Sequence, residues 1–124
     1  MYYAITPVPA PRMTKQDVWL KPRRPCVARY FAFQDHVALL KIEVSERCRI
    51  VFYMPMPKSW SKKKKELMHL QPHQQTPDGD NLEKALLDSV FRDNIKFKDD
   101  SHIWQVHREK RWSYEGGIAI ETII

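Results

Sequence analysis

The stretch of residues 76–88 combines a tight turn with the start of an amphipathic helix and carries closely spaced acidic side chains. Pro77 and Gly79 mark the turn. Asp80 is placed to cap the helix, and Glu83 follows three residues later, as in a capping box that precedes an apolar run. The pattern therefore predicts a turn that presents carboxylates at the beginning of a helix.

Two different faces of this helix are expected from the spacing. Asp80, Lys84 and Asp88 recur every four residues and share one face. The apolar face comprises Leu82, Ala85, Leu86 and Val90. An aspartate before a helix is usually a cap, and an Asp/Lys/Asp series is usually a solvated edge stabilised by ion pairs. That structural interpretation stays open beside a catalytic one.

A second acidic pair, Asp99–Asp100, favours the catalytic interpretation. It follows the segment 95–98, which alternates like a strand. The two acidic pairs, Asp78 with Asp80 and Asp99 with Asp100, repel each other if folding brings them together, unless cations or basic groups lie between them. A hard divalent cation prefers carboxylate oxygens, and Mg²⁺ usually takes only a few from the protein while keeping water and substrate phosphate. The four aspartates therefore indicate a candidate magnesium site.

Length and composition limit the class of protein. At 124 residues with 43% hydrophobic residues, we expect one globular domain spanning residues 1–124. Twenty-one basic against 15 acidic residues give a net charge of +6, which favours nucleic acid as a partner and an anionic membrane surface second. We find no run of 18 apolar residues and no signal-peptide pattern, so we expect a soluble, cytoplasmic protein without a membrane partner.

Apolar periodicity and turn residues predict the order β–α–β–(α)–loop–α–β–β. The expected elements are a strand in 1–8, a helix in 30–40, a strand in 49–54, a short helix in 58–68, a loop in 71–76, a helix after Asp80, and strands in 103–107 and 118–124. Residues 108–117 are interpreted as a basic connection that ends in a Gly116–Gly117 turn. This order predicts an α/β (α+β) fold with a mixed four-stranded sheet covered by about two main helices.

Two basic segments are candidates for contacts with a phosphate backbone. The first comprises Lys58 and the run Lys62, Lys63, Lys64 and Lys65. Such a run is most often a solvated surface, but here it lies between the best strand and the acidic turn, which favours a DNA contact. Trp60 either stacks on a base or anchors the short helix, and the anchor is favoured. The second segment is a loop with Arg23 and Arg24, interpreted either as solvated or as phosphate-binding.

Other site patterns are absent. With three glycines the chain contains neither a Walker A loop nor a dinucleotide-binding loop. His69 and His73 have helical spacing, but Pro72 lies between them and no thiol or acidic residue stands at zinc-site spacing, so a zinc site is not indicated.

The combined acidic motif resembles that of the RusA-like crossover-junction endodeoxyribonucleases. The resemblance lies in the pattern P-D-x-D-N-L-x-K-x-x-x-D at residues 77–88, followed by D-D-S-x-I at 99–103, and it extends over nearly the whole chain. The stretch Met-Pro-Lys-Ser-Trp-Ser-Lys-Lys-Lys-Lys at 56–65 is similar to the branch carried by phages and prophages.

This resemblance implies an activity, a cofactor and site residues. It implies a homodimer that cuts four-way (Holliday) DNA junctions by paired symmetric nicks. The implied cofactor is Mg²⁺, for which Mn²⁺ can substitute. The implied metal-binding carboxylates are Asp78, Asp80 and Asp100, with Lys84 as the essential lysine and Asp88 and Asp99 near the site. The other classes left open are a non-catalytic basic nucleic-acid-binding module, a nuclease of broader branched-DNA specificity, and a structural protein whose basic face binds another protein.

Overall fold

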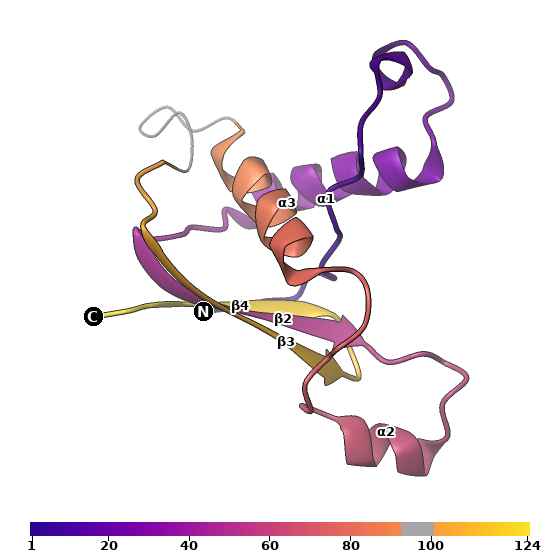
Figure 1. The fold of residues 1–124 in the computed structure, drawn as a ribbon, viewed down its shortest axis with the longest axis vertical. Helices are drawn as coiled ribbons and strands as arrows, with labels where there is room; N and C mark the ends of the chain where they lie inside the picture. The colour runs from indigo at the N-terminus through magenta and orange to yellow at the C-terminus, as the bar shows by residue number, and fades with distance from the viewer. Residues whose placement is uncertain (93–100) are drawn as a thin grey trace.

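A computed structural model describes residues 1–92 and 101–124 of the chain. Its elements, in chain order, are β1 (Tyr2–Tyr3), the 3₁₀ helix η1 (Lys15–Val18), α1 (Pro25–Leu40), β2 (Arg47–Pro55), α2 (Lys62–Met68), α3 (Gly79–Phe91), β3 (Gln105–Ser113) and β4 (Gly117–Thr122). The predicted order of elements is confirmed, and the chain forms a single α/β domain (Figure 1).

The four strands form one mixed sheet in the order β1-β4-β2-β3. β4 pairs antiparallel with both β1 and β2, whereas β2 and β3 run parallel, from Arg47 opposite Gln105 to Pro55 opposite Ser113. A parallel pair needs a long crossover connection, and here that connection contains α2 and α3. The predicted mixed four-stranded sheet is therefore confirmed.

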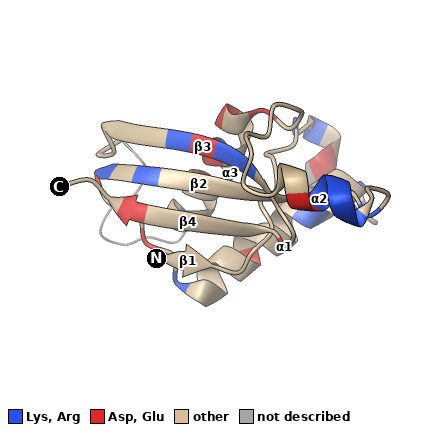
Figure 2. Cartoon of the chain, turned by 90° about the horizontal axis from the view of Figure 1, so that it is seen from below, with Lys and Arg blue, Asp and Glu red and all other residues tan. Residues whose placement is uncertain are grey.

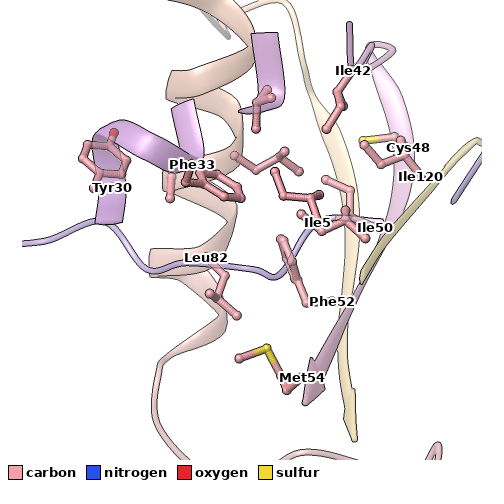
Figure 3. Packing of buried hydrophobic residues seen from close by; sticks show 14 residues of the cluster. Ile5, Tyr30, Phe33, Ile42, Cys48, Ile50, Phe52, Met54, Leu82 and Ile120 are labelled. Atoms are coloured by element: carbon pink, nitrogen blue, oxygen red, sulfur yellow. The ribbon is translucent and has the colours of Figure 1, made fainter. Parts of the chain in front are cut away.

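The hydrophobic core lies between the sheet and the two long helices, α1 and α3, which cover the same face (Figure 1). Alternate residues of β2 point into it: Cys48, Ile50, Phe52 and Met54. The helices add Tyr30, Phe33, Val37, Leu82, Ala85 and Leu86 (Figure 3). Each fully buried large apolar side chain contributes roughly 1.5–3 kcal/mol of transfer free energy. This packing holds the first turn of α3 in a defined position over the sheet.

The opposite face of the sheet is covered by no helix in the described residues (Figure 2). Charged side chains pair across the strands there: Arg49 of β2 contacts Glu109 of β3, and Arg111 lies 3.1 Å from the same carboxylate. Val51 is nevertheless buried between these neighbours. This face is therefore a polar surface supported by cross-strand ion pairs.

Three predicted boundaries are wrong. α1 begins at Pro25 rather than near residue 30, because proline suits the first position of a helix. β3 extends to Ser113, so residues 108–113 form a strand and not a connection, since they pair with the central strand β2. β1 comprises only Tyr2–Tyr3, because the chain turns directly after it: the Ile5 N–H donates to the Tyr3 carbonyl at 2.9 Å instead of to a neighbouring strand.

The short basic helix is confirmed as α2, with its start at a capping serine. The Ser61 side chain accepts a hydrogen bond from the Lys64 backbone N–H at 3.1 Å. In residues 1–92 and 101–124, no helix has the length and apolar character needed to span a bilayer.

Candidate active site

The acidic turn lies at the amino end of α3, but its capping residue differs from the prediction. Asp78, not Asp80, occupies the N-cap position with an extended backbone (φ −66°, ψ 144°), and its carbonyl oxygen accepts from the Leu82 N–H at 3.2 Å. The predicted N-cap is therefore wrong by two residues, and no capping box forms at Asp78. The Asp78 carboxylate makes no capping hydrogen bond, and the side chains of both aspartates are exposed.

The predicted faces of α3 are confirmed. Leu82, Ala85 and Leu86 are buried and Val90 is half-buried against the core, whereas Asp80, Lys84 and Asp88 are exposed. At a rise of 1.5 Å per residue, Lys84 lies about 6 Å along the axis from Asp80, and Asp88 lies about 12 Å away. Asp78, Asp80 and Lys84 thus all lie in the amino-terminal part of α3. Asp88 lies near α1 instead: burial raises the pKa of Tyr30, and the charge of Asp88 raises it further.

The two carboxylates of the turn suit a hard cation. Asp80 Oδ1 accepts a hydrogen bond from the Asn81 N–H at 3.0 Å, which holds one oxygen of that carboxylate. Mg²⁺ is commonly bound by one or two carboxylates together with water and substrate phosphate. Within residues 1–92 and 101–124, no group of three or more potential ligand side chains gathers. The described part of the site therefore supplies an open carboxylate pair rather than a closed metal site.

The second acidic pair, Asp99 and Asp100, lies outside the described residues. The chain is described again from Ser101, and the His102 ring meets the edge of the Phe91 ring, 5.2 Å away, at the carboxyl end of α3. The approach of Asp100 to the acidic turn stays a prediction.

The segment 70–77 connects α2 to the acidic turn and is bound along the outer edge of β3. The Leu70 N–H donates to the Trp112 carbonyl, the Trp112 N–H to Gln71, and the His73 N–H to Lys110. The isolated bridge between Pro72 and Arg111 belongs to the same contact. These bonds fix the path of the segment, which we call the strap, up to the point where the acidic turn begins.

Lys110 of β3 binds the last part of the strap through its side chain. Its Nζ donates to the carbonyl oxygens of Gln75 and Pro77, each at 2.7 Å. Burial lowers the pKa of Lys110, the charge of Asp78 opposes that shift, and the Arg108 charge adds to it. One ammonium group thus holds the residue immediately before Asp78 and faces the Asp78 carboxylate.

Arg108, two residues before Lys110 on β3, contacts the first turn of α3. Its Nη1 is 3.6 Å from Glu83 Oε1, and a Cβ at Gly79 would lie only 2.7 Å from its Nε. The absence of a side chain at Gly79 therefore lets the guanidinium approach the first turn of α3. Together with Lys84 and Lys110, Arg108 gives the acidic turn a surrounding of three cations.

Aromatic stacking anchors the base of α2. The ring centroids of Trp60 and Trp112 of β3 are 4.7 Å apart, and the centroid of the His73 ring lies 4.2 Å from that of the same indole. Lys64 Nζ lies over the Trp60 ring at 4.2 Å. These contacts support the anchoring role of Trp60. Burial lowers the pKa of His73, and the charge of Lys110 lowers it further.

The lysines of the basic run surround α2, which buries none of its residues and projects from one end of the sheet (Figure 2). Lys58, Lys62, Lys63 and Lys64 are exposed and Lys65 is half-buried. The strap joins this cationic projection directly to the acidic turn. Their contact with DNA stays a prediction.

The two loop arginines have internal partners. Arg24 pairs with Asp17, with Nη2–Oδ2 at 2.7 Å, and the Arg23 guanidinium lies 4.2 Å from the centre of the Phe31 ring. The Arg24 side chain is still accessible to a ligand, because 41% of it is exposed. Phosphate binding by this pair therefore also stays a prediction.

Sequence reasoning missed Lys110 and Arg108 as residues of the site. Both lie in the part of β3 that was interpreted as a connection. The usable signal was the two-residue alternation that places Val106, Arg108, Lys110 and Trp112 on one side of an extended strand. That signal is weak where charged residues follow one another.

The family model described as "Endodeoxyribonuclease RusA" matches residues 26–123. No curated protein matches the chain. The matched region contains the acidic turn, α2, the strap and β3, and it begins after the loop that carries Arg23 and Arg24.

Proposed function

This chain belongs to the RusA endodeoxyribonuclease family, and we propose that it resolves four-way DNA junctions by paired symmetric nicks, as a homodimer that uses Mg²⁺ or Mn²⁺. The observation that carries the proposal is the exposed pair Asp78 and Asp80 beside Lys84 at the amino end of α3, joined by the strap to the basic helix α2. A homodimer supplies the two equivalent sites that paired nicking requires.

The acidic turn would hold the metal. We assign Asp78 and Asp80 as ligands, with Asp100 as the predicted third carboxylate and Asp99 as a possible neighbour. A bound divalent ion supplies an activated water and neutralises the charge that develops on phosphate oxygens. The contribution of the turn is to present two exposed carboxylates two residues apart, of which that of Asp78 makes no cap hydrogen bond.

Lys84 acts one helical turn beyond Asp80. Its exposed ammonium group is placed to neutralise a non-bridging phosphate oxygen or to orient the attacking water. The N-terminus of α3 adds partial positive charge on the same side. The lysines of α2 bind the DNA backbone, which adds affinity without base preference.

The test compares cleavage and binding of a labelled four-way junction and a plain duplex over a Mg²⁺ titration. Asp78→Asn and Asp80→Asn should each lower junction cleavage at least about 100-fold, since even outer-shell partners of a metal cost 10–100-fold when removed. Junction binding in EDTA should stay equal or become stronger, because a negative charge is removed from a phosphate-facing surface.

Glu115→Gln is the control for charge. It removes one negative charge from an exposed residue between β3 and β4, outside the acidic turn, and should retain cleavage. Metal-dependent cleavage that survives Asp80→Asn would refute the assigned site. Metal-independent binding without cleavage would instead identify a nucleic-acid-binding module. Equal cleavage of flaps and four-way junctions would identify a nuclease of broader branched-DNA specificity.

A further inference from the structure

The segment 12–24, which we call the arm, projects from the molecule between β1 and α1 (indigo, upper part of Figure 1). It carries five basic residues and one acidic residue, hence a charge of +4 out of +6 for the whole chain. The family model begins at residue 26, so the arm lies outside the matched region. The function assigned to the family region therefore leaves this basic projection unexplained.

The base of the arm is held in a defined conformation. The Asp17 side chain is 1% exposed and accepts from Arg24 Nε at 2.8 Å and Arg24 Nη2 at 2.7 Å. It also accepts from the Thr14 N–H at 2.7 Å and the Thr14 hydroxyl at 3.1 Å. Arg24 Nη2 further donates to the Arg12 carbonyl at 3.1 Å. These bonds join the two ends of the arm through one buried carboxylate.

The arm presents its largest apolar side chain to solvent. Trp19 is 81% exposed, and Leu20 beside it is 41% exposed. An open depression of about 490 Å³ is lined by Gln16, Trp19, Leu20 and Lys21. An indole held on an ordered, basic loop has a flat apolar face for stacking and cations nearby for phosphate, which is the combination that binds unpaired nucleic acid.

The arm starts beside the acidic turn. The Ala10 N–H donates to the carbonyl of Asn81 at 3.3 Å, and Asn81 follows Asp80 directly. In Figure 1 the arm and α2 project from opposite ends of the molecule, and the amino end of α3 lies between them. DNA that reaches the carboxylate pair can therefore meet one basic projection on each side.

We propose that the arm is a second DNA contact, in which Trp19 stacks on a base exposed at the branch point while Lys15 and Lys21 bind the flanking phosphates. The choice of DNA over a second copy of the chain rests on charge, since two arms of +4 repel each other. The proposal rests on the proposed nuclease function and adds to it the means of distinguishing a branch from a continuous duplex.

The test measures binding in EDTA to a four-way junction with 2-aminopurine at the branch point and to a duplex of equal length. Trp19→Ala should weaken junction binding about 5- to 150-fold, which corresponds to ~1–3 kcal/mol for one stacked base. It should also abolish the quenching of 2-aminopurine that the unchanged protein produces. Duplex affinity and the salt dependence should stay the same, because no cation is removed.

Two further variants separate stacking from charge. Trp19→Phe retains an aromatic face and should recover most of the junction affinity. Lys15→Gln combined with Lys21→Gln should weaken junction and duplex alike and reduce the salt slope by about 2. Trp104→Ala is the matched control, because that indole is 66% exposed at the start of β3 and not on the arm.

Equal effects of Trp19→Ala and Trp104→Ala on the junction would overturn the arm contact. So would an unchanged junction affinity together with a smaller oligomer in sedimentation, which would make the arm a contact between copies. Loss of 2-aminopurine quenching in Trp19→Ala, without any metal-dependent cleavage by the unchanged protein, would support the arm contact and overturn the nuclease proposal instead.

Discussion

Lys110→Met tests whether the acidic turn is held in place from the neighbouring strand. The substitution keeps an unbranched side chain that packs as before and removes the ammonium group that donates to the Gln75 and Pro77 carbonyls at 2.7 Å each. Hydrogen bonds with a charged partner contribute about 1.5–3 kcal/mol each. Because the bond to Gln75 is exposed to solvent, we take about 2 kcal/mol for the pair, or roughly a 30-fold change in the population of the ordered turn.

An opposing electrostatic effect acts on metal binding. Removing a positive charge near Asp78 favours a bound cation, by about 1 kcal/mol for a unit charge at 4 Å in water and about 4 kcal/mol near a protein surface. The ordering effect by itself raises the Mg²⁺ concentration for half-maximal cleavage by up to about 30-fold, because a site that is ordered only part of the time binds with proportionally lower apparent affinity. Amide hydrogen exchange without metal measures the ordering effect separately from the charge effect, and we expect exchange of the turn to become faster.

The assay combines a Mg²⁺ titration of junction cleavage with amide hydrogen exchange of residues 76–82 in the absence of DNA and metal. Exchange there should become faster in Lys110→Met, whereas Lys110→Arg, which keeps a charged donor, should lie closer to the unchanged protein. Lys62→Met is the control for charge alone, since Lys62 is exposed on α2. Unchanged exchange and an unchanged Mg²⁺ midpoint in Lys110→Met would refute the reasoning.

Two other predictions concern α2 and the strap. Replacing the four lysines at 62–65 by alanine should weaken junction binding and reduce its salt slope by up to about 3.6, at 0.9 per phosphate contact; an unchanged slope would remove α2 from the DNA interface. Because the pKa of His73 is lowered in the folded protein, the imidazole is protonated in the unfolded chain first as the pH falls. The contribution of neutral His73 to the stability of the fold is therefore complete above about pH 6.5 and is lost below it. His73→Phe, which keeps the ring on Trp112 and removes an Nδ1 that has no hydrogen-bond partner among the described residues, should therefore lose less thermal stability between pH 7.5 and 5.5, and equal losses in both proteins would contradict the assignment.

Local patterns in the sequence were sufficient to predict the amphipathic helix α3 and the short basic helix α2. Leu82, Ala85 and Leu86 are buried as their spacing indicates, and Ser61 caps the helix that follows it. Such features depend on residues three or four positions apart, which are read directly from the chain. The acidic turn is recognisable for the same reason, because all its members lie within a dozen residues.

Contacts between distant residues decided the rest. The strand from Gln105 to Ser113 contains five charged or histidine residues in succession and has no clear alternation of its own, yet it pairs along its whole length with β2. Only that pairing turns Lys110 toward the strap, 33 residues away from Pro77 in the chain. Likewise, the start of the arm is held beside the acidic turn by the Ala10–Asn81 bond and by packing of Val8 and Ala10 against the core. Local residue types thus determined which groups are available for chemistry, and long-range strand pairing and packing determined which of them meet, because both depend on the whole chain closing on itself.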